Sequence, residues 1–113
     1  MLTKVHRLTF EKDFIRAYKS GKSFGSEHLR LISLRTNQNN FRFGFVVSKK
    51  HAVRIVDRNR IKRILRAETS KYIAQIALGY DIVIQARPGV KNTSAQRIRE
   101  ELRDLLQKSK VLQ

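Results

Sequence analysis

Apolar residues recur with helical spacing in some stretches of the chain and alternate with polar residues in others. The first stretch predicts a helix over residues 11–20, because apolar side chains three or four positions apart share one helical face. Thr9 is the expected N-cap, and Gly21 is the expected residue just beyond the helix. The apolar face of this helix consists of Phe10, Phe14, Ile15, Ala17 and Tyr18.

Alternating and β-branched segments predict the strands. Residues 27–36 and 41–48 are each typical of a strand, and the turn at 37–40 between them predicts that the two form a hairpin. The second of these strands places Phe41, Phe43, Phe45 and Val47 on one face. Residues 80–86 predict a further strand, and the pattern leaves a short strand near Ser23 open.

Two more helices complete the pattern. A long helix is expected from about 53 to 67, with a continuation toward 77 left open, and Gly79 ends this region. Ser94 can cap the last helix, whose apolar stripe is Ala95, Ile98, Leu102, Leu105 and Leu106. The order α-β-β-α-β-α, with the optional strand near Ser23, predicts an α+β sandwich in which helices pack on one sheet. With one proline and no repeat or low-complexity segment, residues 1–113 are expected to form a single domain.

The charge of the chain points to a polyanionic partner. The 113 residues carry a formal net charge of +16, while 41% of them are hydrophobic, so the charge is expected on a folded domain. Residues 49–66 hold eight lysines and arginines against the single acid Asp57. On a helix, Arg58, Lys62 and Arg66 form one stripe of like charges, whereas a merely solvated face usually mixes signs. Nucleic acid is therefore the expected partner.

Several classes of protein are excluded or disfavoured. The chain has no cysteine, which excludes disulfides, thiol catalysis and Cys-based zinc sites. Without a signal peptide or an apolar run long enough for a membrane, a cytoplasmic location is expected. The nine acids are scattered, and Asp13 with Glu11, like Glu100 with Glu101, is expected on a helix surface as solubility charge. No metal site and no catalytic site made by the polypeptide is expected.

Two segments carry a resemblance to a known family. They are residues 43–50, Phe-Gly-Phe-Val-Val-Ser-Lys-Lys, and residues 58–66, Arg-Asn-Arg-Ile-Lys-Arg-Ile-Leu-Arg. This pattern resembles the signature of the protein subunit of bacterial ribonuclease P. The surroundings of Phe14 and Gly21, and the strand at 81–87, are similar to other parts of that family. The resemblance covers nearly the whole chain.

The resemblance implies a fold and a function. The fold would be an α-β-β-(β)-α-β-α sandwich with a central mixed sheet and a left-handed β-α-β crossover, as in a domain of a small-subunit ribosomal protein. The chain would be the accessory subunit of an endoribonuclease that removes the 5′ leader of precursor tRNA. Catalysis would belong to the RNA subunit and its Mg²⁺ ions, with no organic cofactor. One protein monomer would bind one catalytic RNA, without a membrane.

The resemblance also implies roles for particular residues. The residues expected to bind the catalytic RNA are Lys49, Lys50, Arg54, Arg58, Asn59, Arg60, Lys62, Arg63 and Arg66. Those expected in a cleft for the precursor-tRNA leader are Phe10, Phe14, Tyr18, Phe45 and Val47. Two alternatives stay open: the aromatics of the first helix could be plain core residues, and the protein could be a ribosomal or general RNA-binding protein. A self-sufficient ribonuclease is a third reading, against which the scattered acids argue.

Overall fold

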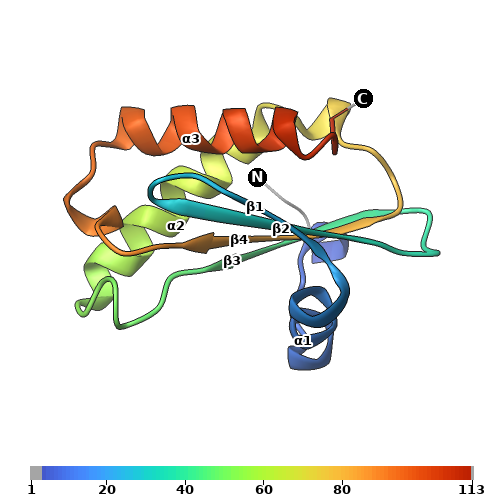
Figure 1. The fold of residues 1–113 in the computed structure, drawn as a ribbon, viewed down its shortest axis with the longest axis horizontal. Coiled ribbons are helices and arrows are strands. Elements are labelled where there is room, and N and C mark those ends of the chain that lie inside the picture. The colour runs from blue at the N-terminus through green and yellow to red at the C-terminus, as the bar shows by residue number, and fades with distance from the viewer. Residues whose placement is uncertain (1–3, 113) are drawn as a thin grey trace.

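A single sheet with helices on both faces forms the protein (Figure 1). The computed structural model describes residues 4–112. The main elements are α1 (Glu11–Ser20), β1 (Lys22–Gly25), β2 (Leu29–Arg35), β3 (Phe41–Val46), α2 (Ile55–Ser70), β4 (Tyr80–Ala86) and α3 (Ala95–Lys108). Three single turns of 3-10 helix lie at Lys4–His6, Ile73–Gln75 and Val90–Asn92. The predicted α+β class is confirmed, and so is the short strand expected near Ser23.

The strand order is β1-β2-β4-β3, which corrects the predicted hairpin. The strands β2 and β3 follow one another in sequence but do not pair, because β4 lies between them, antiparallel to β2 and parallel to β3. The hairpin is instead formed by β1 and β2. The reason lies in β4, where four consecutive residues, Asp81 to Ile84, are buried. Such a strand needs a neighbour on each side and cover on both faces, which only an inner position supplies.

Two hydrophobic cores lie on opposite faces of the sheet. The larger core is closed by α2, through Ile61 and Leu65, and by α3, through the predicted stripe from Ile98 to Leu106. The smaller core lies under α1 and contains Leu8, Ala17, Ile32 and Val83. In Figure 1, α3 lies above the sheet and α1 crosses below one half of it.

The helix boundaries match the pattern closely, but two of the predicted end residues act differently. Phe10, and not Thr9, is the N-cap of α1, and it makes no side-chain capping bond. Gly21 has an ordinary φ of −79°. Glycine is needed here because the backbone of α1 passes close by: a Cβ at Gly21 would lie 2.6 Å from the carbonyl oxygen of Ala17. Ser94 caps α3 as predicted, by accepting a bond from the backbone N–H of Arg97.

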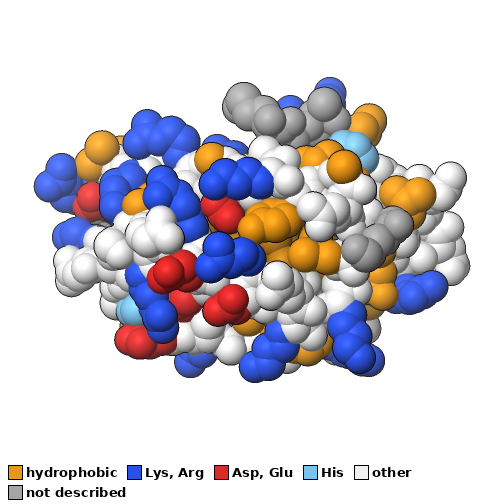
Figure 2. Space-filling view, turned by 90° about the horizontal axis from the view of Figure 1, so that it is seen from above, with side chains coloured by type: hydrophobic (Ala, Val, Ile, Leu, Met, Phe, Trp, Pro, Cys, Tyr) orange, Lys and Arg blue, Asp and Glu red, His pale blue; other side chains and the backbone are white. Residues whose placement is uncertain are grey.

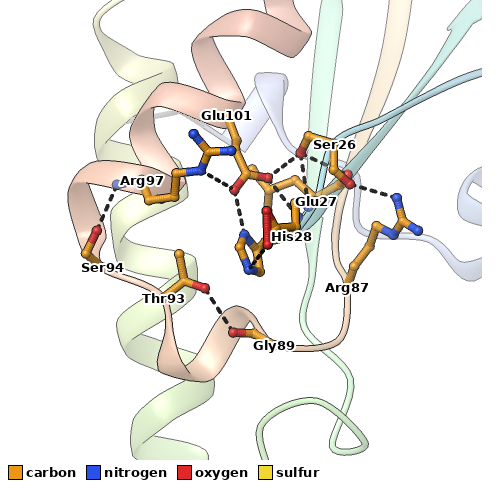
Figure 3. A network of polar contacts seen from close by, with 10 residues as sticks. Ser26, Glu27, His28, Arg87, Gly89, Thr93, Ser94, Arg97 and Glu101 are labelled. Atoms are coloured by element: carbon orange, nitrogen blue, oxygen red, sulfur yellow. Dashed lines mark hydrogen bonds and ion pairs between the residues drawn. The ribbon is translucent and has the colours of Figure 1, made fainter.

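Several acids are buried in ion pairs, so the expectation that they are surface solubility charge is wrong for Asp13 and Glu101. Glu101 is 3% exposed and connects α3 to the β1–β2 turn (Figure 3). It accepts a bond from Ser26 Oγ and one of 2.7 Å from the backbone N–H of His28. His28 Nδ1 lies 2.6 Å from the second carboxylate oxygen, and Arg97 Nε lies 3.2 Å from that oxygen.

Asp13 belongs to a second buried ion network. Arg42 of β3 donates to both carboxylate oxygens of Asp81, at 2.9 and 2.7 Å, and to Asp13 at 3.3 Å. These bonds raise the pKa of Arg42, chiefly through Asp81, against the lowering effect of burial. Because Asp13 lies in the first turn of α1, the network fixes that helix against the sheet. The buried acids Asp13, Asp81 and Glu101 therefore hold the fold together.

Candidate nucleic-acid interface

The helix α2 presents a basic surface on an apolar anchor. Ile61 and Leu65 are fully buried, which fixes the rotation of the helix and turns the basic positions outward. Asn59, Arg63 and Arg66 are exposed, while Arg58, Arg60 and Lys62 are half-buried. The side chains of Arg60, Lys62, Arg63 and Arg66 form no ion pair or hydrogen bond with any residue between 4 and 112. Their donors are therefore available to a ligand.

Arg58 and Arg54 differ from these free cations. The Nη1 of Arg58 donates to the backbone carbonyls of Ala52 and Val53, at 3.0 and 2.7 Å, and so holds the loop that precedes α2. Arg54 Nε lies 3.8 Å from Asp57, which also lies 3.9 Å from Lys91. Arg58 thus has a structural role that the sequence pattern does not reveal, and the charge of Arg54 is partly balanced.

The loop before α2 carries the other two predicted cations. Lys49 and Lys50 are exposed, and the Ser48 side chain accepts a bond of 3.1 Å from the backbone N–H of Lys50. The buried methyl of Ala52 anchors the same loop to the main core. The loop and α2 form one continuous basic segment, which we call the α2 surface, residues 49–66.

A cavity of about 320 Å³ lies beside this surface. It is lined by Arg7, Leu8, Thr9, Phe14, Phe43, Gly44, Phe45 and Arg66. Phe14 reaches it from α1 and packs over Gly44, where a Cβ would lie only 2.4 Å from the Phe14 ring. Arg66 reaches it from α2. The cavity therefore joins an aromatic side chain of α1 to the last arginine of the α2 surface.

The five residues expected in the leader cleft occupy different places. Phe14 and Phe45 line the cavity together, whereas Phe10 and Tyr18 do not line it and are 64% and 39% exposed. Val47 is buried in the main core, on the face of the sheet away from α1. Its neighbour Val46 packs on the α1 side. Phe45 packs on the same main core as Val47, and it meets Phe14 at the cavity, which Val47 does not line.

The sheet also carries a polar group that the sequence pattern did not predict, formed by Arg30, Ser23 and Gln85. Arg30 of β2 donates to Ser23 Oγ at 2.7 Å and to Gln85 at 3.5 Å, and all three line a shallow cavity of about 420 Å³. Burial raises the pKa of the Tyr18 hydroxyl, and the nearby positive charge of Arg30 opposes that effect. Tyr18 therefore stays neutral beside Arg30. The alternating positions of β2 were the only signal that could have placed Arg30 on this face.

No group of three or more His, Asp or Glu side chains between residues 4 and 112 is placed to hold a metal ion. In the same range no helix is long and apolar enough to cross a bilayer. The fold and the basic surfaces together define a small α+β nucleic-acid-binding domain.

Comparison with known proteins gives the family. Residues 2–110 match the Ribonuclease P protein family. The chain is 36% identical to the ribonuclease P protein component of Microcystis aeruginosa, with 98% of this chain and 96% of that protein covered. It is 38% identical to that of Lactococcus lactis subsp. cremoris, with 97% and 92% covered. The chain belongs to the ribonuclease P protein component family, as the resemblance indicated.

Solved structures agree with this assignment. The RNase P protein of Staphylococcus aureus superposes with a TM-score of 0.89 at 32% identity, covering 97% of this chain and 100% of that one. The Thermotoga maritima protein gives 0.80 at 28% identity, covering 90% and 96%. The family is part of an endoribonuclease complex that processes tRNA, and its members have an RNA partner within a ribonucleoprotein.

Proposed function

We propose that the chain is the protein subunit of a ribonuclease P holoenzyme, in which the α2 surface binds the catalytic RNA and the face beneath α1 binds the 5′ leader of precursor tRNA. Hydrolysis of the leader is then the work of the RNA and its Mg²⁺ ions, and the protein acts as one monomer per RNA. The proposed location is the cytoplasm.

The cavity between α1, β3 and α2 is the observation that carries this proposal. It places aromatic rings and an unpaired arginine next to each other at the junction of the two surfaces. Base stacking on an aromatic ring contributes about 1–3 kcal/mol and tolerates any base. A protein that serves many different leaders needs such tolerance, and Phe14 is the ring best placed to provide it.

The unpaired cations of the α2 surface support the other half of the proposal. Arginine presents a planar set of donors that fits a phosphate, and such a contact is strongest when no protein carboxylate competes for it. Arg60 and Arg63 meet that condition. Lys49 and Lys50 add exposed charge where the chain approaches the helix.

Reconstitution tests the proposal. The purified protein is added to a bacterial ribonuclease P RNA at low Mg²⁺, and cleavage of precursor tRNA is measured. We expect cleavage to increase, and Phe14→Ala to weaken the binding of leader-bearing precursor more than that of mature tRNA. Circular dichroism on the same variant checks that it folds.

The alternatives predict other results. Unchanged cleavage together with co-purification with ribosomes would favour a ribosomal or general RNA-binding protein. Cleavage by the protein without any RNA subunit would favour a self-sufficient ribonuclease. Unfolding of the Phe14→Ala variant would assign Phe14 to the core, and the milder Phe14→Leu variant then tests its contact with the leader.

A further inference from the structure

A second basic cavity is lined mainly by the starts of β1 and β4 and the ends of β2 and α3. In Figure 1 the ends of β2 and α3 lie at the end of the molecule away from the start of α2. The volume of the cavity is about 580 Å³. Four cations from three elements line it: Lys22 at the start of β1, Arg35 at the end of β2, and Lys108 and Lys110 at the end of α3. No acidic side chain lies among its lining residues.

The cations of this cavity lack carboxylate partners. Within residues 4–112, Lys22, Lys108 and Lys110 take part in no ion pair, and the side chain of Arg35 has its polar and cation–π contacts with Tyr80. Its Nη1 lies 3.4 Å from the Tyr80 hydroxyl, and its guanidinium lies 5.6 Å from the centre of that ring. Figure 2, which views the molecule from the α3 side, shows Asp and Glu side chains in one half of the face only. Gathered like charges repel each other, so a bound anion would stabilise this arrangement.

The backbone of Lys110 gives an independent sign of function. Lys110 has a φ of +60° and is the one non-glycine residue with positive φ in the described chain, residues 4–112. It directly follows Ser109, the C-cap of α3, at a position where helices favour glycine. A side chain is strained in this conformation. Strain of this kind is often kept at functional sites, and here the strained residue lines the basic cavity.

We propose that this cavity binds a backbone phosphate of the catalytic RNA, as a contact separate from the α2 surface. The inference rests on the proposed function. Phe24 and Tyr80 of the lining pack on the main core, which α2 also covers, although Ser20 at the end of α1 lines the cavity as well. The RNA bound to α2 can therefore continue toward the cavity. Arg35 and the lysines supply charge, and the hydroxyls of Ser33 and Tyr80 supply further donors.

The variant Lys110→Gly separates an effect on RNA binding from an effect on stability. Lys110→Gly removes the strain and one cation together. We expect the variant to melt at the same temperature as the natural protein or higher. We also expect it to bind catalytic RNA about fivefold more weakly, with a salt slope of log K reduced by about 0.7–0.9. The matched control is Arg103→Gln on the exposed side of α3, which removes one charge outside the cavity.

Filter binding of catalytic RNA over a series of salt concentrations makes the measurement, with Arg60→Ala as the reference for the α2 surface. Native affinity of Lys110→Gly overturns the proposal, and an equal loss in Arg103→Gln overturns it by making the effect one of net charge. If Lys110→Gly weakens only precursor tRNA, the phosphate belongs to the substrate and the assignment to catalytic RNA is wrong. If Arg60→Ala weakens RNA binding and Lys110→Gly does not, the cavity proposal fails while the proposed function stands. No binding by the natural protein overturns both.

Discussion

Arg42 and the arginines of α2 are alike in chemistry but differ in what lies beside them. Arg42 is half-buried between the buried carboxylates of Asp81 and Asp13, and all three of its nitrogens have a carboxylate partner. Arg60 and Arg63 have none within the described residues. A chain with 25 basic and 9 acidic residues cannot pair every cation. The comparison teaches that the buried acids lie where the fold needs them, and that the basic side chains without partners are the ones we propose for RNA binding.

The largest expected effect comes from breaking the buried network. Asp81→Ala removes two of the three carboxylate bonds of Arg42 and leaves it with Asp13 at 3.3 Å. Removing one partner of a buried ion pair costs about 3–5 kcal/mol. Urea unfolding should show a loss of that size. A loss below about 1 kcal/mol would mean that water or Asp13 replaces the lost carboxylate, and the distinction between the two kinds of arginine would fail.

The second buried acid, Glu101, gives a pH test. Burial raises the pKa of Glu101, but the bonds from Ser26 and His28 outweigh it and hold the pKa below its usual range. A carboxyl whose pKa is lowered by folding stabilises the protein above its unfolded pKa, and this contribution is lost as pH falls through the folded value. Glu101→Gln should therefore cost about 2 kcal/mol at pH 7 and progressively less below about pH 4.

Thermal melts of both proteins between pH 7 and pH 3 measure this difference. Catalytic-RNA affinity at pH 7 should stay the same, since the partners of Glu101 are Ser26, His28 and Arg97 and none belongs to the α2 surface. A gap between the two proteins that stays constant as the pH falls would show that the carboxylate charge is not what stabilises the turn.

The sequence predicted the elements better than their arrangement. The helix at 11–20 and the strand at 80–86 were placed correctly, because each has a clear period and a clear end. The hairpin was wrong because strands that follow one another usually pair, and only the complete burial of β4 argues otherwise. The roles of Asp13 and Glu101 were missed because their partners lie 29 and 73 residues away in the chain.

Among the candidate RNA-binding residues, too, local features were predicted and features that depend on the fold were missed. The basic run from 49 to 66 is visible in the sequence because its charge is local. The separate role of Arg58 is not visible, since it depends on how the loop before α2 turns back toward the helix. Likewise, the burial of Val47 depends on which sheet face each position of β3 meets, and Arg30 was overlooked for the same reason.

On the α2 surface, the contrast between free and bound arginines predicts two different variants. Arg60→Ala should weaken catalytic-RNA binding about fivefold to tenfold and reduce the salt slope by about 0.7–0.9, with a stability change within about 0.5 kcal/mol. Arg58→Ala should also cost about 1–2 kcal/mol of stability, because the carbonyls of Ala52 and Val53 lose their donor. Urea unfolding together with RNA titration separates the two effects. Equal stability of both variants would contradict the role given to Arg58.

The smallest expected effect is at Arg54, which stands between the two kinds of arginine. It lies on the α2 surface, yet Asp57 is 3.8 Å away and balances part of its charge. Exposed ion pairs contribute about 0–1 kcal/mol, so Arg54→Ala should change stability very little. Its effect on RNA affinity should be smaller than that of Arg60→Ala. Asp57→Asn should do the opposite and strengthen binding, because it leaves Arg54 and Lys91 free to attract phosphate. Weaker binding by Asp57→Asn in the same titration would show that pairing with an acid does not set which arginines bind RNA.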